Sequence, residues 1–153
     1  MDSFDLIVIG GGPAGYGAAL RGAMLGAKVC MVEREEVGGI CLHHGCIPTK
    51  TLLHAVDILR GIETAEQYGL KVELKGIDWE RLQKRKQEVT GRLQRGLLGL
   101  FRARAIELIK GEGTIEDHKE VMVSSQRLKG RAVVLATGSS PLSPPPLRPD
   151  GHR

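Results

Sequence analysis

The sequence predicts an α/β fold in which a parallel sheet is built on a strand–helix–strand unit and a small antiparallel β-meander follows. Residues 6–9 (Leu-Ile-Val-Ile) form a continuous apolar run rich in β-branched side chains, and residues 28–32 (Lys-Val-Cys-Met-Val) form a second run. A helical pattern from about residue 15 to 25 separates them. Strands that are buried on both faces of a parallel sheet have this composition. Residues 132–135 form a further buried strand.

A glycine-rich turn follows the first predicted strand. Gly10, Gly12 and Gly15 have the spacing G-x-G-x-x-G, and Glu33 ends the second strand 18 residues later. In this pattern the first glycine allows the tight turn, the second lets a pyrophosphate approach the backbone, and the third lets helix and strand pack closely. The helix N-terminus favours phosphate, and the acid can accept hydrogen bonds from a ribose diol. We interpret the turn as a dinucleotide site, which the pattern alone does not assign to FAD or NAD. A glycine-rich turn without a ligand is the alternative.

A segment with two cysteines, residues 38–50, follows this unit. Cys41 and Cys46 are five positions apart, glycines precede and separate them, and Pro48 and Lys50 close the segment. A disulfide across so short a loop gains little from loop-closure entropy, and such bridges are reduced more readily than structural ones. The spacing of about one helical turn would place both sulfur atoms on one face. We therefore predict a redox-active disulfide.

Two other interpretations of the cysteine segment stay open. The cysteines could be buried thiols without a role. They could also bind a metal together with His43 and His44, although zinc sites usually draw their ligands from two separated pairs and no second pair follows.

Length and composition narrow the possible class of protein. The 153 residues are enough for one domain, aromatic residues make up 3%, and the net charge is +4. Scarce aromatic residues argue against a nucleic-acid binder that stacks bases. Three cysteines do not form a secreted disulfide scaffold, residues 1–5 do not resemble a signal peptide, and no apolar run reaches the roughly 18 residues of a membrane span. We expect a cytosolic protein, with neither nucleic acid nor membrane as a partner.

The rest of the chain supplies helices and short strands. Residues 51–59 continue helically after the cysteines. A second helix from about Trp79 to Arg102 carries an apolar stripe. Its opposite face is basic, and a basic amphipathic helix could bind a membrane surface or nucleic acid. We interpret it instead as a solvated face or a contact to an acidic partner. Strands are expected at residues 106–110, 121–123 and 127–129, with a hairpin turn at 117–119. The apolar stripe comprises Trp79, Leu82, Val89, Leu93, Leu97 and Phe101.

Together these residues resemble the flavin-dependent pyridine nucleotide–disulfide oxidoreductases. The resemblance covers residues 5–153, and its most specific part is the Cys-x4-Cys motif with its flanks. It implies a Rossmann-like FAD-binding domain that is incomplete. We expect residues 1–140 to be the N-terminal portion of that domain and residues 141–153 to be a Pro-rich linker towards an NAD-binding domain. The motifs that carry the resemblance are residues 10–15, Glu33, Cys41 to Lys50, residues 111–113 and residues 136–138.

The resemblance also implies roles for individual residues. Cys46 would be the thiolate that faces the flavin and forms a charge-transfer pair with it, and Cys41 the outer thiol that attacks the lipoamide disulfide. A thiolate needs nearby positive charge or a helix N-terminus. Lys50 would raise the electron affinity of the flavin, and Glu33 would bind the FAD ribose. The residues expected to contact FAD are Gly10, Gly12, Pro13, Ala14, Gly15, Glu33, Arg34, Gly39, Ile40, Cys41, Lys50, Gly113, Ala136, Thr137 and Gly138.

Within the family, the sequence Cys-Ile-Pro-Thr-Lys at residues 46–50 is most similar to the dihydrolipoyl dehydrogenases. That branch implies oxidation of dihydrolipoamide with NAD as the final acceptor. Its partners are a lipoyl-bearing protein of a 2-oxo acid dehydrogenase or glycine cleavage complex and a second subunit in a homodimer. Mercuric reductases, which have Val in place of Ile47, are an alternative.

The sequence departs from the family pattern at three residues and in length. His43 and His44 stand where the family often has Asn and another residue, and Ile40 stands where many members have Thr. Family members are roughly three times as long, so Arg153 resembles a truncation point and we expect the chain alone to be catalytically incompetent. Two alternatives are a stand-alone FAD-binding or thiol-exchange module and a non-functional remnant with an open sheet edge.

Overall fold

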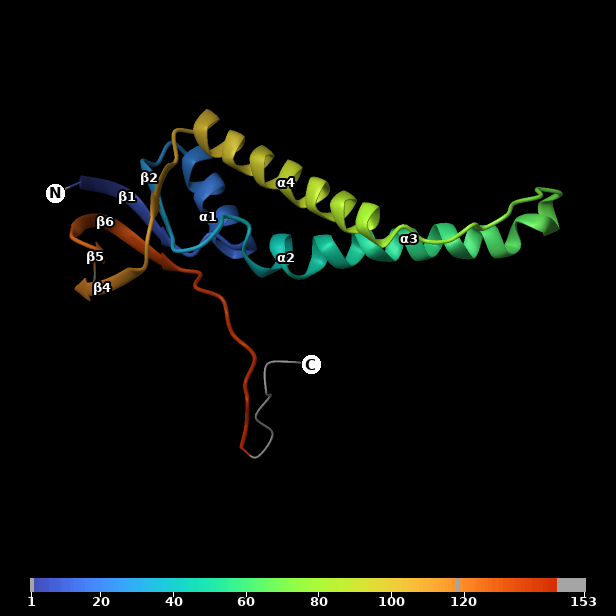
Figure 1. Ribbon diagram of the computed structural model, residues 1–153. Helices are drawn as coiled ribbons and strands as arrows, with labels where there is room; N and C mark the ends of the chain where they lie inside the picture. The colour runs from blue at the N-terminus through green and yellow to red at the C-terminus, as the bar shows by residue number, and fades with distance from the viewer. Residues whose placement is uncertain (1, 118, 146–153) are drawn as a thin grey trace.

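The computed structural model describes residues 2–117 and 119–145, which fold as one sheet with helices and a projecting helical hairpin (Figure 1). The predicted hairpin turn at 117–119 and the predicted linker at 141–153 fall partly outside the described residues. The elements in chain order are β1 (Asp2–Ile9), α1 (Pro13–Met24), β2 (Val29–Glu33), α2 (Gly39–His43), α3 (Cys46–Thr64), the 3-10 helix η1 (Ala65–Tyr68), α4 (Trp79–Ala103), β3 (Glu107–Lys110), β4 (Gly113–Asp117), β5 (Glu120–Val123) and β6 (Gln126–Leu135).

The sheet has six strands in the order β3-β2-β1-β6-β5-β4. β3, β2, β1 and β6 are parallel to one another, whereas β6, β5 and β4 pair as an antiparallel meander. The predicted α/β class, with a parallel sheet and a small meander, is therefore confirmed.

One strand prediction is wrong. Residues 127–129 and 132–135 were expected as two strands, but both belong to the ten-residue strand β6. Its first half pairs with β5 and nearly its whole length pairs with β1. Gly130 lies between the two runs and continues the strand. In the structure it allows close packing, because a Cβ there would lie 3.1 Å from Ile7 side-chain carbons.

Strands β1 and β2 bury side chains on both faces, as their uninterrupted apolar runs predicted. Residues 132–135 of β6 are not the buried strand that was predicted, because Leu135 is 63% exposed and Val133 and Val134 are only half-buried. One face of β1 and β2 packs against the meander and the other packs against helices α1 and α4. Full burial of each large apolar side chain stabilises the fold by about 1.5–3 kcal/mol. The meander side is formed by Ile7, Ile9, Cys30, Val32, Val121, Val123 and Leu128, and the helix side by Val8, Val29, Met31, Ala19 and Phe101.

Helices α3 and α4 form a long antiparallel hairpin that extends away from the sheet (Figure 1). The predicted helix from about Trp79 to Arg102 is confirmed as α4, which starts at an N-cap where Asp78 accepts a hydrogen bond from the Arg81 N–H (2.9 Å). The apolar stripe is only partly covered. Phe101 is buried against the sheet, whereas Trp79 and Leu93 are exposed because only α3 lies beside the outer half of α4.

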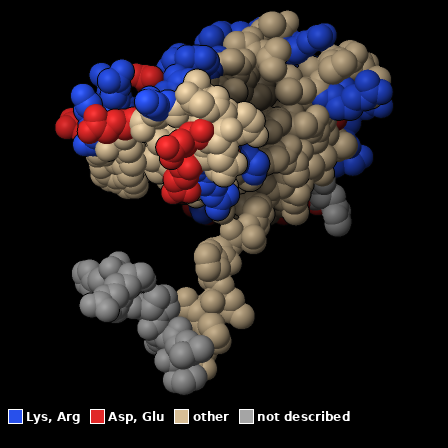
Figure 2. Space-filling model, turned by 90° about the vertical axis from the view of Figure 1, so that its right-hand side faces the viewer, with Lys and Arg blue, Asp and Glu red and all other residues tan. Residues whose placement is uncertain are grey.

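Figure 2 views the molecule from the outer end of the hairpin. Lys and Arg side chains gather along the upper rim, on the side where α4 lies in Figure 1. Among the described residues no helix is both long enough and apolar enough to span a membrane.

Candidate functional site

The glycine-rich loop between β1 and α1 contains two glycines that are tightly packed and one that faces open space. A Cβ on Gly10, whose φ is 102°, would overlap the Ala136 carbonyl oxygen, and a Cβ on Gly15 would overlap the Gly10 carbonyl oxygen. At Gly12 the nearest atom to such a Cβ is 4.0 Å away. The first and third glycines are therefore required by the fold, whereas the space at Gly12 is available to a ligand.

Helix α1 begins directly at this loop. Gly12 is its N-cap, no side chain caps it, and its first turn contains no acidic residue. Pro13 and Ala14, both exposed, form that first turn. The unpaired backbone N–H groups and the positive end of the helix dipole can bind an anion such as a pyrophosphate.

Glu33, at the end of β2, is already bonded on both carboxylate oxygens. Oε2 accepts a hydrogen bond from the Gly11 N–H (2.6 Å) and Oε1 accepts one from the Glu35 N–H (2.7 Å). These bonds tie the glycine-rich loop to the end of the neighbouring strand, which the sequence did not reveal. Each carboxylate oxygen has a second lone pair, so Glu33 retains capacity to accept bonds from a ligand hydroxyl.

A cavity of about 170 Å³ lies at the carboxyl ends of the parallel strands. Ligands of open α/β sheets bind at this edge, where connections leave a strand in opposite directions. The cavity brings together five predicted residues, namely Gly10, Glu33, Arg34, Gly113 and Thr137. Sequence reasoning did not assign its other lining residues, Ile9, Val32, Gly111 and Glu112, to the site, although Gly111 and Glu112 belong to the Gly-Glu-Gly motif that follows β3.

The segment after β6 closes this edge. The Ala136 N–H donates to the Ile9 carbonyl oxygen (2.8 Å), which places Thr137 beside the cavity. Gly138 follows with φ 76°, a backbone conformation that glycine adopts without strain.

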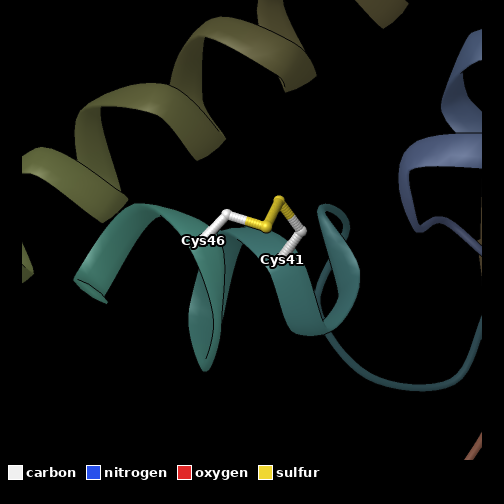
Figure 3. Close-up of a disulfide and its surroundings, with 2 residues drawn as sticks. All are labelled: Cys41 and Cys46. Carbon is white, nitrogen blue, oxygen red and sulfur yellow. A yellow bond between two sulfur atoms is a disulfide. The ribbon is translucent and has the colours of Figure 1, made fainter. Parts of the chain in front are cut away.

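Cys41 and Cys46 form a disulfide with Cα atoms 4.7 Å apart (Figure 3). They do not lie on one helical turn, as the spacing suggested. The helix breaks at His44 and Gly45, so Cys41 belongs to α2 and Cys46 is the first residue of α3. The break occurs because Gly45 leaves the helical region, with φ −127° and ψ −105°.

Cys46 lies at the N-terminal end of a long helix. It starts a 19-residue helix whose first turn has no acidic side chain, so the positive end of the helix dipole is not offset there. Lys50 lies one turn further along the same helix and is exposed. Cys46 is exposed and Cys41 is half-buried.

Backbone contacts join the disulfide segment to the glycine-rich loop. The Gly38 N–H donates to the Gly11 carbonyl oxygen (2.8 Å), and a Cβ on Gly39 would lie 2.8 Å from the Gly12 Cα. His43 Nε2 lies 3.0 Å from the Val37 carbonyl oxygen, which only accepts, so this nitrogen carries the proton. The two predicted functional segments are therefore neighbours in space.

The cavity and the disulfide are nevertheless distinct places. None of Cys41, Cys46, Lys50, Gly39 and Ile40 lines the cavity. Ile40, where a hydroxyl would be typical of the family, is 59% exposed on the first turn of α2. A ligand that reached both places would therefore have to be extended.

Cys30 is a buried free thiol, as predicted for a small apolar core residue. Burial, followed by the nearby carboxylate of Glu107, raises the pKa of this thiol to about 12. With this pKa the thiol is protonated at neutral pH, where its reactive thiolate is scarce.

Comparisons with known proteins agree with this arrangement. The profile of the family described as "Pyridine nucleotide-disulphide oxidoreductase" matches residues 4–151. The dihydrolipoyl dehydrogenase of Acholeplasma laidlawii is 41% identical over 93% of this chain, that of Thermus scotoductus is 42% identical over 93%, and one of Bacillus subtilis is 35% identical over 97%. The chain spans 43%, 31% and 34% of the lengths of these relatives. A glycine-rich loop next to a Cys-x4-Cys disulfide, together with the match over nearly the whole chain, shows that this chain belongs to the pyridine nucleotide-disulphide oxidoreductase family.

Proposed function

We propose that this chain carries the FAD site and the redox-active disulfide of an oxidoreductase of the dihydrolipoyl dehydrogenase type. The observation that supports this most is the contact between the two segments. The open glycine, Gly12, lies against Gly39 at the start of the helix that holds Cys41. An extended flavin dinucleotide with its pyrophosphate at Gly12 would have one end near Glu33 and the other near the cysteines.

The residues present fit such a cofactor. Gly12 leaves room for the pyrophosphate, the N-terminus of α1 offers N–H donors, and Glu33 keeps acceptor capacity beside the 170 Å³ cavity. When bound, FAD supplies a two-electron acceptor for the reduced cysteines. The residues that would hold it are Gly10, Gly12, Pro13, Ala14, Gly15, Glu33, Arg34, Gly39, Ile40, Cys41, Lys50, Gly113, Ala136, Thr137 and Gly138.

The disulfide itself performs thiol exchange with a dithiol substrate. A substrate thiolate attacks Cys41 Sγ, the Cys41–Cys46 bond breaks, and Cys46 leaves as a thiolate with the bonding electron pair. The second substrate thiolate attacks the substrate sulfur of the mixed disulfide, and Cys41 is released. The substrate dithiol is oxidised to a disulfide, the cysteine pair is reduced, and the two substrate protons go to Cys41 and to solvent.

The helix start explains why Cys46 is the leaving sulfur. A thiol with a lowered pKa is the better leaving group, and Cys46 lies at the N-terminus of α3. In this assignment Cys46 would face the bound flavin, and Lys50 would contribute positive charge beside it. Cys41 remains the exchanging thiol.

The names of the relatives suggest the substrate class. In the longer protein we propose dihydrolipoamide on a lipoyl-bearing protein as the dithiol, NAD as the final acceptor and a homodimer as the assembly. Residues 1–140 would belong to the FAD domain and residues 141–153 would lead towards the NAD domain.

A flavin titration with two glycine variants tests the proposal. FAD fluorescence is recorded while the purified chain is added, for the unmodified chain, Gly12→Ala and Gly17→Ala. At Gly17, on α1, a Cβ would have no atom within 4 Å, so this variant is the matched control. We expect Gly12→Ala to weaken FAD binding at least tenfold and Gly17→Ala to leave it unchanged. Equal binding by both variants, or no binding by the unmodified chain, would contradict the proposal.

A further inference from the structure

The outward face of α4 carries a stripe of arginines that the flavin and disulfide sites do not use. Arg81, Arg85, Glu88, Arg92, Arg95 and Arg102 follow one another at steps of four, three, four, three and seven residues. Residues with this spacing share one face of a helix, so the stripe runs for about 30 Å. All six side chains are exposed. We call these six residues the arginine stripe.

Apart from Arg102, which lies in the last turn where the helix dipole favours a cation, the charges of the stripe do little to stabilise α4 itself. The helix has seven Lys and Arg against two Glu, and Arg81–Arg85 and Arg92–Arg95 are like-charge neighbours, which destabilise a helix. Its one ion pair joins Arg85 and Glu88 (3.8 Å). In the part of the chain that the structure describes, the other four arginines form no ion pair. These four arginines are therefore available to groups outside the part of the chain that the structure describes.

Beside the outer part of the stripe, near the start of α4, lies an open groove of about 990 Å³ between α3 and α4. Arg81, Lys84 and Arg85 line it together with two apolar side chains, Leu82 and the 54% exposed Ile58 of α3. Basic, acidic and apolar groups therefore lie side by side along this groove, because Asp78, Glu80 and Glu88 also line it. Figure 2 shows the Lys and Arg side chains that gather on this side of the hairpin.

We propose that the arginine stripe and this groove bind an acidic segment of another protein, with carboxylates on the arginines and an apolar side chain against Ile58. Arginine forms paired hydrogen bonds with carboxylates and is enriched in protein interfaces. A polyanion is the poorer fit, because Glu88 interrupts the stripe and Asp78 and Glu80 line the groove, where they would repel successive phosphates. A protein can instead place a cation or an apolar group opposite these carboxylates.

Fluorescence anisotropy with two labelled probes tests this surface. The first is a 21-residue helical peptide with Glu at every third or fourth position and Leu on an adjoining face. The second is a 20-nucleotide oligothymidylate. Both are titrated with the full chain at 50 and 200 mM NaCl. We expect the peptide to bind at least tenfold more tightly than the oligonucleotide at both salt concentrations. Tighter binding of the oligonucleotide would overturn the proposal in favour of a nucleic-acid surface.

Charge reversals locate the binding surface. Arg92→Glu with Arg95→Glu is compared with Lys71→Glu and Lys75→Glu, which change the net charge equally on the exposed loop of the same hairpin. We expect the arginine pair to lose at least tenfold in peptide affinity and the lysine pair less than threefold. Equal losses would show that only net charge attracts the peptide and would overturn the proposal.

A third variant tests the apolar part of the surface. Ile58→Ser should weaken the leucine-containing peptide severalfold and leave binding of a leucine-free glutamate peptide unchanged. An unchanged affinity for both peptides would mean that the groove does not contact the peptide, and would overturn the proposal. Circular dichroism melting curves verify that all variants are folded. None of these residues belongs to the proposed FAD or disulfide site, so the outcome is independent of flavin binding.

Discussion

The sheet and the helical hairpin use apolar residues in opposite ways. In the sheet, Ile7, Val8 and Met31 have no exposed surface, because the meander and the helices cover both faces. In the hairpin, Ile77 and Trp79 are 61% and 62% exposed, and α4 rests on only one neighbour along its outer half. The stability of this chain therefore resides in the sheet, and the hairpin offers surface for contacts with other molecules. The disulfide lies where the two regions meet.

Truncation of one large side chain in each region should give the largest difference. Phe101, 2% exposed where α4 meets the sheet, packs in the core, whereas Trp79 is at the exposed start of α4. We expect Phe101→Ala to lower the free energy of unfolding by about 3–5 kcal/mol. Trp79→Ala should change it by less than about 0.5 kcal/mol, which is typical of exposed positions.

Urea unfolding followed by circular dichroism measures both values. Similar losses for the two variants would mean that the outer hairpin is part of the cooperative core, and the contrast between the regions would be wrong.

Replacing a glycine by alanine should change the stability in opposite directions in the two regions. A Cβ at Gly10 would overlap the Ala136 carbonyl oxygen at a φ of 102°, whereas at Gly96 in α4 it would have no atom within 4 Å. We expect Gly10→Ala to destabilise the fold by about 1–3 kcal/mol. Gly96→Ala should stabilise it by about 0.5–1 kcal/mol, because alanine favours a helix interior. Thermal melts measure the melting temperature of each variant relative to the unmodified chain. Shifts of the same sign for both variants would refute the packing argument.

Thiol reactivity should distinguish the buried cysteine from the two at the base of the hairpin. Since the pKa of Cys30 is raised to about 12, its reactive thiolate is scarce at pH 8. After reduction, we expect Ellman's reagent to modify Cys41 and Cys46 rapidly and Cys30 only in guanidinium. The number of thiols that react before and after unfolding, with peptide mapping, measures this. Rapid modification of all three thiols in the folded chain would show that the sheet opens readily.

The pH-dependent contribution of Asp5 to the stability of the fold should be the smallest effect. The pKa of Asp5 is lowered by a hydrogen bond from the Lys28 N–H (2.9 Å) and by Arg131 (3.2 Å). Because the folded-state pKa is below the unfolded-state value, this stabilisation is present above the unfolded-state pKa and is lost as the pH falls through the folded-state pKa. Asp5→Asn should therefore lose stability at pH 7 and approach the unmodified chain at pH 2–3.

Urea midpoints across this pH range test the Asp5 effect, with Asp57→Asn on the hairpin as the control. A loss of stability for Asp5→Asn that stays constant down to pH 2 would assign the effect to packing and not to charge.

The sequence predicted those features that depend on local pattern. Residues 6–9 and 29–32 read as buried strands because every side chain is apolar, and Gly10, Gly12 and Gly15 predicted the turn between them. Features set by distant contacts were missed or misread. The continuity of β6 through Gly130, which packs against Ile7, and the hydrogen bonds that Glu33 accepts from Gly11 and Glu35 follow from tertiary structure.

The same distinction applies to the cysteine segment. The Cys-x4-Cys spacing correctly suggested a disulfide, but not the helix break at Gly45 that places Cys46 at a helix start. The spacing cannot show this break, because it arises from the backbone conformation of one glycine. The contact of Gly39 with Gly12 was equally invisible, since it joins two segments that are separated in the sequence by α1 and β2.

The visible absorption spectrum of the FAD-loaded chain, before and after reduction with dithiothreitol, tests most directly that the glycine-rich loop and the disulfide form one flavin–disulfide site. We predict a flavin band that gains a long-wavelength shoulder on reduction in the unmodified chain and not in Cys46→Ser. A flavin spectrum that does not respond to the cysteines, or a chain that takes up no FAD, would contradict this account.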